Sequence, residues 1–482
     1  MAKSKDEGYE ISMKIPEGAE KIIQILTDAG YEAYVVGGCV RDKILGVEPE
    51  DWDITTSAKP NEIKKLFRKT IDTGIEHGTV TVLLSGGIFE VTTYRMDAGY
   101  EDHRHPDKVI FTPSLEEDLK RRDFTINAMA YNHTRGIVDL YDGRRDLKEG
   151  VIRAVGEPDE RFREDALRML RAIRFSAKFG FDIEERTFDA IKKNASTITY
   201  TSAERIQTEL VKLLCSDHPA RIRAAYETGL SRYFLPELDL MMETEQNNPH
   251  HIYSVGEHTL CVLKEVNNIY KKLEKEKDIS EDDAHRKKKA LMLSALFHDV
   301  GKPECKTTDE AGTDHFYKHD KVGADMAVKI CRRLKLDNFT THMVKLLVMY
   351  HDSRYGFAVD DAGEYTRRSK NKMRRLMGEV GVDNMPYLFI LQEADILAQS
   401  DYHKEDKLHT LRAGITCYKE IKRDNDAIHI QDLAISGLDL IEKKGYTTGP
   451  AIGAELKRLL DLVIDNPSLN TYDTLMDLCK EK

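Results

Sequence analysis

The sequence predicts an α+β protein with several domains, in which a small mixed β-sheet domain comes first and all-α domains follow. Strand patterns, which are short apolar or alternating runs between turn-forming residues, are confined to about the first 150 residues, and helical spacing dominates after them. A chain of 482 residues is long enough for about three domains. Its 40% hydrophobic and 33% charged residues are typical of a globular protein with an ample core.

The sequence predicts several helices and strands in about the first 150 residues. We expect a helix at 17–29 with Ile22, Ile23, Ile25 and Leu26 on its buried face, a strand at 32–36, a helix from Pro60 to 70, and strands at 79–84 and 88–95. The turn-forming residues 85–87 between the last two strands indicate a hairpin. Residues 97–113 lack periodicity and are rich in charge and turn formers, so we expect a mobile loop there.

The composition excludes some classes of protein. No apolar run approaches the roughly 20 residues of a transmembrane helix, and the N-terminal segment lacks the apolar core of a signal peptide. The seven cysteines are scattered without a C-x-x-C pair, which favours free thiols in a reducing compartment. We therefore expect a cytoplasmic protein that does not contact a membrane.

The charge distribution bears on nucleic-acid binding. A net charge of −11 opposes contact with phosphates, but two segments are locally basic. Residues 161–178 hold six basic and two acidic side chains, and residues 367–375 hold six basic and no acidic ones. The second run is either an RNA contact or a solvated face, and its composition favours neither.

Two carboxylates one residue apart, Asp51 and Asp53, follow the glycine-containing run GGCVRD at 37–42. Alternate residues of a strand point the same way, so the two side chains project together if the chain continues extended into Ile54. Paired carboxylates suit Mg²⁺, which takes oxygen ligands and leaves positions for phosphate oxygens. A Gly-Gly turn lets the backbone approach a triphosphate closely. Together these features indicate metal-assisted nucleotidyl transfer, although each alone is common on polar surfaces.

Six motifs in a fixed order resemble those of the class II tRNA nucleotidyltransferases, which are the bacterial and eukaryotic CCA-adding enzymes with their poly(A) polymerase relatives. The motifs are VVGGCVRD (35–42), DWDITT (51–56), FEVTTYR (89–95), DLKRRDFTINAMAY (118–131), REDALRMLRAIRF (163–175) and SAERIQTEL (202–210). The resemblance covers at least residues 31–215. It implies addition of CCA to the 3′ end of tRNA from CTP and ATP, with release of pyrophosphate. It also implies that the loop at 97–113 helps the switch from C to A addition.

The resemblance extends to individual residues. Glu90, which shares a strand face with Thr92 and Tyr94, would be a third acidic residue near the Mg²⁺ site of Asp51 and Asp53, and its alternative is an exposed hairpin glutamate. The family's nucleotide-contacting positions are matched by Gly38 and Arg41 at the phosphates, Arg122, Asp123 at the ribose hydroxyl, and Arg171 and Arg174 near the triphosphate.

Asp165 and Arg168 lie three residues apart in 161–179, a segment of helix-forming composition, so we expect them to be neighbours on one helix face. Cytosine and adenine both present an amino donor beside a ring-nitrogen acceptor, whereas uracil and guanine present a carbonyl beside an N–H. A carboxylate and a guanidinium can therefore select CTP and ATP. The matching EDxxR motif has this role in the family. The alternative is an ordinary surface ion pair.

A second resemblance, to HD-superfamily metal phosphohydrolases, covers about residues 250–400. It is carried by the ordered set His258, His298, Asp299 and Asp395. Imidazole and carboxylate ligands suit a transition metal such as Mn, Ni, Co or Zn. His319 and His351 are candidates for substrate phosphate or for a second metal. The resemblance implies hydrolysis of 2′,3′-cyclic or 2′-phosphates, whereas a degenerate HD domain would only support tRNA.

We therefore expect a nucleotidyltransferase head at 1–150, a helical neck at 151–245, an HD domain at 246–400 and a helical tail at 401–482. The highly charged segment 271–289 predicts an exposed insertion. Residues 437–467 pair a Gly-Pro turn with an amphipathic helix and resemble the tail of HD-bearing CCA-adding enzymes. The resemblance implies that this segment grips tRNA, and the alternative is helical packing alone.

Three other functions remain open. The first is a poly(A) polymerase or an enzyme that adds only CC or only A. The second is a phosphohydrolase with an RNA-binding head, which the presence of both Asp51 and Asp53 opposes. The third is an alarmone synthetase-hydrolase, in which we would expect the HD domain to come first.

Overall fold

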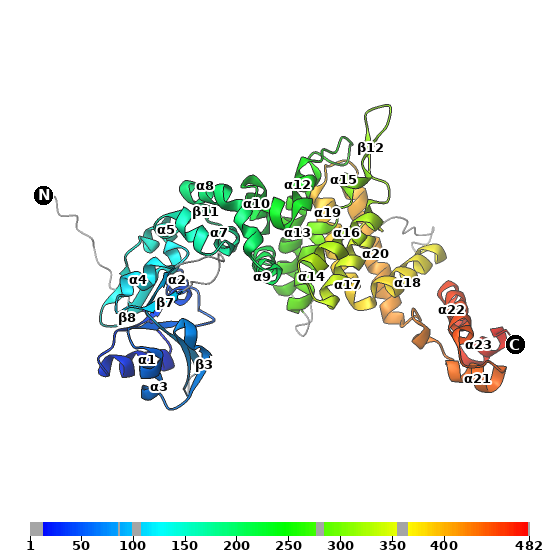
Figure 1. Cartoon of the computed structure of the whole chain (residues 1–482). Coiled ribbons are helices and arrows are strands. Elements are labelled where there is room, and N and C mark those ends of the chain that lie inside the picture. Colours follow the sequence, from blue (N-terminus) through cyan, green and yellow to red (C-terminus); the bar gives the residue numbers. More distant parts are fainter. Residues whose placement is uncertain (1–12, 85–86, 99–107, 276–283, 354–364, 481–482) are drawn as a thin grey trace. The chain divides into compact units, whose positions relative to one another are not determined.

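The computed structural model describes residues 13–84, 87–98, 108–275, 284–353 and 365–480. Two compact units make up the chain, Met1–Pro236 and Glu237–Lys482 (Figure 1). The centres of the predicted mobile loop (99–107) and of the predicted charged insertion (276–283) lie outside the described residues, as do residues 85–86 of the predicted hairpin turn. None of the helices in the described ranges has the length and apolar composition needed to cross a membrane.

A mixed β-sheet of seven strands forms the core of the first unit, as the sequence predicts. In spatial order its strands are β3 (Thr70–Gly74), β4 (Thr79–Leu84), β5 (Gly87–Thr93), β2 (Ile54–Thr56), β1 (Ala33–Val36), β8 (Met129–Asn132) and β9 (Gly136–Asp139). β2 and β5 run parallel, and the other neighbouring strands of this sheet run antiparallel. The segment with Asp51 and Asp53 leads directly into β2, so the sheet fixes the position of these carboxylates.

The helices of this head region in the described residues are α1 (Glu17–Asp28), α2 (Gly38–Ile44), α3 (Pro60–Leu66), α4 (Leu115–Lys120) and α5 (Gly143–Glu149). α1 buries Ile22 and Leu26 as predicted, whereas Ile23 and Ile25 are half-buried. α3 begins at Pro60 as predicted but ends before residue 70, because Phe67 takes an extended conformation and is buried.

The prediction of a loop throughout 97–113 is wrong at both ends. The strands β6 (Arg95–Ala98) and β7 (Lys108–Phe111) pair antiparallel, with Arg95 opposite Phe111. The Phe111 ring lies so close to Gly78 that a Cβ on Gly78 would be 2.8 Å from it. This contact anchors the hairpin against the head, which the charged composition of the segment did not reveal.

The rest of the first unit is mainly helical. Its elements are α6 (Pro158–Glu164), α7 (Leu167–Phe179), α8 (Glu185–Asn194), α9 (Ala203–Leu214), α10 (Arg223–Glu227) and α11 (Ser231–Phe234), with short parallel strands β10 (Val151–Ile152) and β11 (Asp182–Ile183). The single helix predicted at 161–179 is wrong, because the chain leaves helical geometry at Asp165, where φ is −145°. Asp165 Oδ1 accepts a hydrogen bond of 3.1 Å from the N–H of Leu167, the first residue of α7.

The second unit is a helical body. Its helices are α12 (Pro236–Glu243), α13 (Val255–Lys275), α14 (Ala284–Phe297), α15 (Lys302–Cys305), α16 (His319–Arg333), α17 (Asn338–Tyr350), α18 (Arg367–Val380), α19 (Met385–Ala398) and α20 (Lys404–Asp424), and a short hairpin joins β12 (Thr307–Thr308) to β13 (Asp314–His315). α13 packs against α14 and α19, and α17 packs against α14 and α16. These helices bring together the histidines and aspartates of the HD region.

The C-terminal helices α21 (Gly437–Lys444), α22 (Pro450–Asp465) and α23 (Tyr472–Leu478) share a small apolar core. The basic run 367–375 lies on α18 and is partly a packing contact, which neither prediction for it anticipated. Arg374 is buried, pairs with Asp426 at 2.7 Å and donates to the Ile464 carbonyl at 3.1 Å. Arg368 and Lys372 are exposed.

Two candidate functional sites

The three predicted acidic residues of the head come together at the start of β2. Asp51 and Asp53 immediately precede this strand, and Glu90 lies on the parallel neighbour β5, where Ile54 is opposite Val91. Loss of hydration raises the pKa of Asp53, Arg122 lowers it, and the nearby carboxylates of Glu90 and Asp51 raise it again, with a net upward shift. Repelling carboxylates with oxygen as their only donor fit a hard divalent cation such as Mg²⁺.

The glycine run lies against the same site. The Val36 N–H donates to the Asp53 carbonyl at 3.0 Å, and Gly37, with φ of +82°, precedes α2. A Cβ on Gly37 would lie 2.8 Å from Arg122 Nη1, so both the backbone conformation and the close approach of Arg122 favour glycine here. Arg122 is therefore placed between the glycine turn and Asp53.

Arg41, a predicted phosphate contact, is buried beside Gly38. Its guanidinium pairs with Asp42 at 2.7 Å, donates to Asn127 Oδ1 and lies 4.9 Å from the Phe179 ring centre. A Cβ on Gly38 would lie 3.5 Å from Arg41 Nη2. These contacts fix the orientation of Arg41 next to the glycine turn.

Asp123, the predicted ribose contact, is buried in a polar network. Its Oδ2 accepts from Arg171 Nε at 2.9 Å and Nη2 at 2.6 Å, and its Oδ1 accepts from Asn127 Nδ2 at 3.0 Å and the Phe124 N–H at 2.8 Å. Burial alone would raise the pKa of Asp123, but the Arg171 guanidinium and the Asn127 amide hold it well below its ordinary value. Asp123 is therefore an ionised acceptor throughout the physiological range.

The side chains of Asp165 and Arg168 do not pair with each other, and only the Arg168 N–H donates to the Asp165 carbonyl, at 3.0 Å. Asp165 pairs with Arg205 at 2.7 Å, and Arg168 pairs with Glu164 at 2.6 Å and donates to the Arg121 carbonyl at 3.0 Å. The physical reason is the break between α6 and α7, which removes Asp165 from the face of α7 that carries Arg168.

Arg171 and Arg174 share a partner that the residue-by-residue predictions missed. Glu209 on α9 lies 2.5 Å from Arg174 Nε and 3.6 Å from Arg171 Nη1, and Arg174 also lies 3.8 Å from the Phe175 ring centre. Glu209 and Arg205 both belong to the motif at 202–210. The motif marked the segment as important, but only the fold places it against α7.

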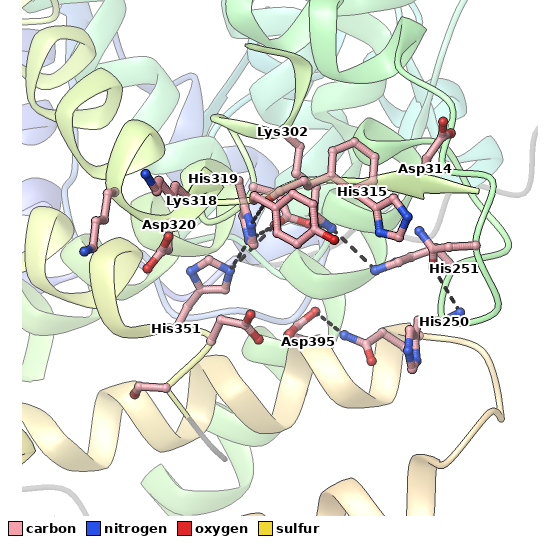
Figure 2. A pocket seen from close by; sticks show the side chains of 18 of the residues that line it. His250, His251, Lys302, Asp314, His315, Lys318, His319, Asp320, His351 and Asp395 are labelled. Carbon is pink, nitrogen blue, oxygen red and sulfur yellow. Dashed lines mark hydrogen bonds and ion pairs between the residues drawn. The ribbon is translucent and has the colours of Figure 1, made fainter. Parts of the chain in front are cut away.

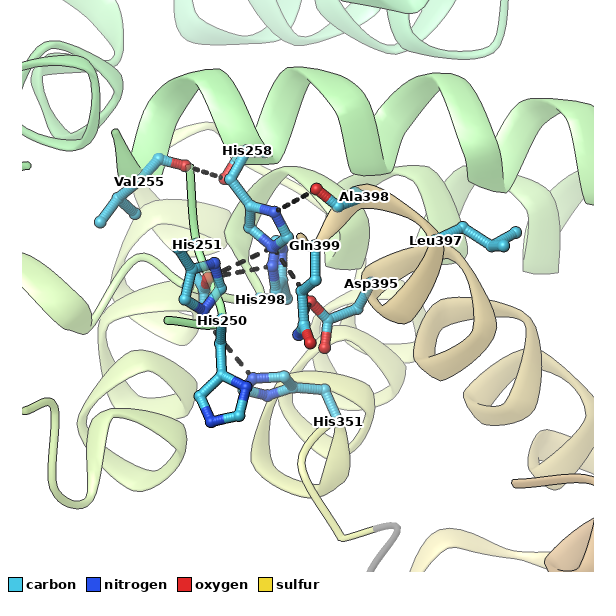
Figure 3. A network of polar contacts seen from close by, with 12 residues as sticks. His250, His251, Val255, His258, His298, His351, Asp395, Leu397, Ala398 and Gln399 are labelled. Carbon is cyan, nitrogen blue, oxygen red and sulfur yellow. Dashed lines mark hydrogen bonds and ion pairs between the residues drawn. The ribbon is translucent and has the colours of Figure 1, made fainter. Parts of the chain in front are cut away.

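The HD region brings its predicted ligands into one buried cluster (Figure 3). His258 Nε2 lies 3.0 Å from Asp395 Oδ1 and 3.8 Å from Asp299 Oδ2, and His298 Nε2 lies 3.2 Å from Asp299 Oδ2. His258 comes from α13, Asp395 from α19, and the His298-Asp299 pair follows α14. The buried His298 Nε2 has no hydrogen-bond partner among the described residues, as expected for a ligand atom that faces a metal position.

The remaining two predicted histidines, His319 and His351, lie beside each other (Figure 2) and form a second group with Asp299. Their Nε2 atoms are 3.2 Å apart, and both face Asp299 Oδ1, at 3.4 Å from His319 and 3.6 Å from His351. His319 begins α16, and His351 follows α17. All six predicted HD residues therefore belong to one cluster.

Charge balance keeps Asp299 ionised. Burial alone would raise its pKa, but His298 and Lys302 hold it well below the ordinary value. Burial lowers the pKa of His258, which keeps this imidazole neutral and able to act as a ligand. Burial alone would lower the pKa of His351, but the Asp299 carboxylate raises it above the ordinary value.

A cavity of about 820 Å³ gives access to this cluster, and His251 and Lys302 line it (Figure 2). The sequence predictions did not include these two residues. Lys302 Nζ lies 2.7 Å from Asp299 Oδ2 and donates to Gln246 Oε1 at 2.8 Å. Lys302 is three residues after Asp299, so its helical spacing was a signal that could have found it.

Family models match three successive parts of the chain: a poly A polymerase head domain at 33–153, a probable RNA and SrmB-binding site of polymerase A at 180–242, and an HD domain at 255–399. Curated relatives include the CCA-adding enzymes of Lactiplantibacillus plantarum and Limosilactobacillus reuteri, which are 52% and 53% identical over 218 residues. Each alignment covers 45% of this chain and 54% of the relative, so the match spans about half the length of these curated relatives.

Solved structures match over nearly the whole chain. The crystal structure of the Bacillus stearothermophilus CCA-adding enzyme in complex with CTP has a TM-score of 0.66 at 28% identity and covers 97% of this chain and 98% of that one. The Thermotoga maritima CCA-adding enzyme complexed with tRNA has the same fold, with a TM-score of 0.58 at 20% identity over 97% and 96% of the two chains. These findings confirm the resemblance to the poly(A) polymerase and tRNA nucleotidyltransferase family, here with an HD domain.

Proposed function

We propose that this protein adds CCA to the 3′ end of tRNA. The terminal 3′-hydroxyl oxygen of the tRNA forms a bond with the α-phosphorus of CTP, and later of ATP, while the bond to the leaving pyrophosphate breaks. The observation that carries the proposal is the convergence of Asp51, Asp53 and Glu90 beside Gly37 and Arg122. The curated relatives and the structural neighbour bound to CTP support it.

Asp51 and Asp53, with Glu90 beside them, would hold Mg²⁺ in the head. When bound, Mg²⁺ supplies charge stabilisation to the attacking and leaving oxygens of the transfer. Gly37 and Gly38 leave room for the triphosphate, and Arg122 and Arg41 offer positive charge beside it. Arg171 orients Asp123, whose carboxylate is then available in one fixed position near the sugar.

We assign base selection to Asp165 and Arg168, which requires both side chains to change partners. Asp165 would release Arg205 to accept from the base amino group, and Arg168 would turn a free N–H toward the ring nitrogen. The side chains of both ion pairs are only 13–26% exposed, so the new contacts to the base must replace these pairs as they break. The family's motif at these positions supports the assignment.

We assign a second, hydrolytic activity to the HD domain. His258, His298, Asp299 and Asp395 would hold a transition metal ion, which supplies Lewis acidity and a nucleophilic water at neutral pH when bound. The expected substrates are 2′,3′-cyclic or 2′-phosphates. The buried ligand cluster beside an 820 Å³ cavity supports hydrolysis over a purely supporting role for this domain.

The partners follow from the two reactions. We propose tRNA, CTP and ATP as partners of the head. We assign the tRNA contacts to residues 180–242 of the neck and to the C-terminal helices. The structural neighbour complexed with tRNA supports this choice. The described cysteines are all free thiols, which fits a reducing cytoplasm.

The experiment uses three tRNAs, one lacking CCA, one ending in C and one ending in CC, each incubated with one labelled nucleoside triphosphate and Mg²⁺. We expect CTP to be added until the tRNA ends in CC, ATP to be added once and only to that tRNA, and UTP and GTP to be rejected. Repeated addition of ATP to any RNA would instead identify a poly(A) polymerase. Addition of CTP without ATP, or the reverse, would identify a partial enzyme.

A further inference from the structure

A second cavity of the helical body lies beside α18 and is separate from the HD cavity. It has a volume of about 1080 Å³, and we call it the α18 cavity. Tyr350 and Ser353 line both cavities, and the other lining residues differ. Four cationic side chains from the basic run of α18 line the α18 cavity: Arg367, Arg368, Lys372 and Arg375. Neither of the reactions proposed above uses this cavity.

Two other cations of the same run are neutralised by acidic side chains of the protein. Arg374 pairs with Asp426 at 2.7 Å, and Lys370 pairs with Glu420 at 3.4 Å. Neither Arg374 nor Lys370 lines the α18 cavity. The remaining positive charge of the run is therefore confined to one hollow and is not spread along the helix.

Asp465, the last residue of α22, holds two of the four cations at the cavity wall. Its Oδ1 accepts from Arg375 at 3.1 Å and from Asn371 at 2.9 Å, and its carbonyl accepts from Arg367 at 2.7 Å. Among the described lining residues, Glu379 is the one other acidic side chain. Four cations and two carboxylates leave an excess of positive charge in the cavity.

Arg368 and Lys372 carry this excess. Arg368 has no hydrogen-bond or ion-pair partner in the described ranges, and it lies one helical turn before Lys372. Burial and the charge of Arg368 lower the pKa of Lys372. Like charges four residues apart destabilise a helix, as do cations in a first turn that has no acidic residue. A bound anion would remove both costs.

The far end of the α18 cavity has a different chemistry. Leu376 is buried there, and burial together with a hydrogen bond to Glu379 raises the pKa of Tyr350 to about 12. A carboxylate beside an aromatic and an aliphatic side chain suits a ring that carries amino or hydroxyl groups, and it repels a phosphate. Arg368 and Glu379 lie about 16 Å apart along the helix, so the two ends fit different parts of one elongated ligand.

We propose that the α18 cavity binds a nucleoside polyphosphate, with its phosphates at Arg368 and Lys372 and its sugar and base toward Tyr350 and Glu379. Arg368 can donate two N–H groups to one phosphate, and Lys372 adds a mobile positive charge. RNA is the less favoured occupant, because successive phosphates of a strand need a basic stripe, and the charge here is confined to a hollow.

The test follows the acetylation of single lysines in the full-length chain by mass spectrometry. Lys372 lines the cavity, and Lys370 is an internal control on the same helix. GTP and ATP are the probes, and the readout is local, so ATP bound in the head does not count. At about ten times its dissociation constant, a bound nucleotide should slow acetylation of Lys372 about 10-fold and leave Lys370 unchanged.

Arg368→Ala should abolish this protection, and its fold should be intact because the side chain is exposed. The matched control is Arg332→Ala, which removes an exposed arginine of α16 outside the cavity lining and should keep the protection. Inorganic triphosphate should bind about 5-fold more weakly than the nucleotides, since it lacks the contacts at Tyr350 and Glu379.

Three results would overturn the proposal. Equal slowing of Lys370 and Lys372, or equal protection by sulfate at the same ionic strength, would mean that ions only screen the charges. Protection by a mixed-sequence RNA but by neither nucleotide would make this face an RNA surface. Equal affinity for inorganic triphosphate and the nucleotides would remove the nucleoside from the assignment.

Discussion

The two candidate centres obtain their ligands in opposite ways. In the head, Asp51 and Asp53 are exposed neighbours in one short segment, and Glu90 joins them from the adjacent strand. In the HD domain, residues from the ends or interiors of five helices meet around Asp299, and all of them except the half-buried His319 are buried. The first arrangement leaves an open, oxygen-only site that a large RNA end can reach. The second provides imidazoles in a protected cavity, which favours softer metals and small phosphoesters.

Arginine also serves different purposes in the two regions. In the head, Arg171 is held beside Asp123 and Glu209, where it can still orient a nucleotide contact. On α18, Arg374, near the end of the basic run, instead joins helices to one another. A dense run of basic residues is therefore not by itself evidence of an RNA surface.

The largest expected effect tests the open site. Asp53→Ala should lower CTP and ATP addition about 10³-fold, because a metal ion contributes several kcal/mol to the transition state of phosphoryl transfer. tRNA binding, measured by filter retention, should change little. The control Asp72→Ala removes an exposed carboxylate of β3 in the same sheet, which pairs with Lys64 of α3, and it should be nearly neutral. Near-normal addition by Asp53→Ala would mean that these carboxylates do not take part in nucleotide addition.

A smaller effect sharpens the account of base choice. Asp165→Asn should raise the relative use of UTP and GTP about 10-fold to 100-fold, since a two-bond contact to a base gives about 1–3 kcal/mol of discrimination. Competition between labelled triphosphates measures this ratio directly. The matched control is Asp159→Asn, which breaks an ion pair between α6, the helix that precedes Asp165, and Lys193 of α8. An equal slowing of all four nucleotides would mean that Asp165 does not select the base.

Arg374 and Arg375 should differ in how much they contribute to stability. Arg374→Met should destabilise the contact between α18 and α22 by about 2–3 kcal/mol, because it leaves Asp426 and the Ile464 carbonyl without their partner. Hydrogen exchange in residues 450–465 should become about 30-fold faster. Arg375→Met breaks an exposed pair with Asp465 and should cost less than about 1 kcal/mol. Equal effects of the two substitutions would contradict the structural role of Arg374.

The smallest expected effect is on the local stability of residues that line the HD cavity. Hydrogen bonds from Lys306, the Asn247 N–H and Thr308 lower the pKa of Asp314 to about 2. Because this pKa is below that of the unfolded chain, the stabilisation is complete above about pH 4 and is lost as the pH falls toward 2. Hydrogen exchange in residues 307–315, corrected for the intrinsic rate, should therefore rise below pH 4. Asp314→Asn should abolish this acid dependence, and Asp325→Asn on the exposed face of α16 should not.

The sequence predicts those parts of the molecule whose signals are local. The sheet pattern and the spacing of Asp51 and Asp53 are properties of short segments, and the structure reproduces the strands that position them. The side chains of Asp165 and Arg168 do not pair because the chain leaves helical geometry at Asp165, and Arg205, the ion-pair partner of Asp165, is 40 residues away. The partners of Arg374 are even more distant, and one is a backbone carbonyl, which no residue pattern identifies.

The HD cluster also shows what a sequence pattern can and cannot identify. Its order of residues identifies the six members, and three of the Nδ1 contacts reach a carbonyl only three residues earlier in the chain. The division of Asp299 between two sets of histidines depends on how α16 and α17 pack against each other. Packing of this kind is decided by the whole core, so the sequence could name His319 and His351 as candidates but could not show which oxygen of Asp299 they face.

The most direct test of two independent centres follows both reactions in the same protein preparations. Wild type, Asp51→Ala, and the double variant His298→Ala with Asp299→Ala are each assayed for CTP incorporation into tRNA lacking CCA and for hydrolysis of a 2′,3′-cyclic phosphate, across Mg²⁺, Mn²⁺ and Ni²⁺. We expect Asp51→Ala to lose incorporation and keep hydrolysis, and the double variant to do the reverse. A folded double variant that loses both activities equally would contradict the account.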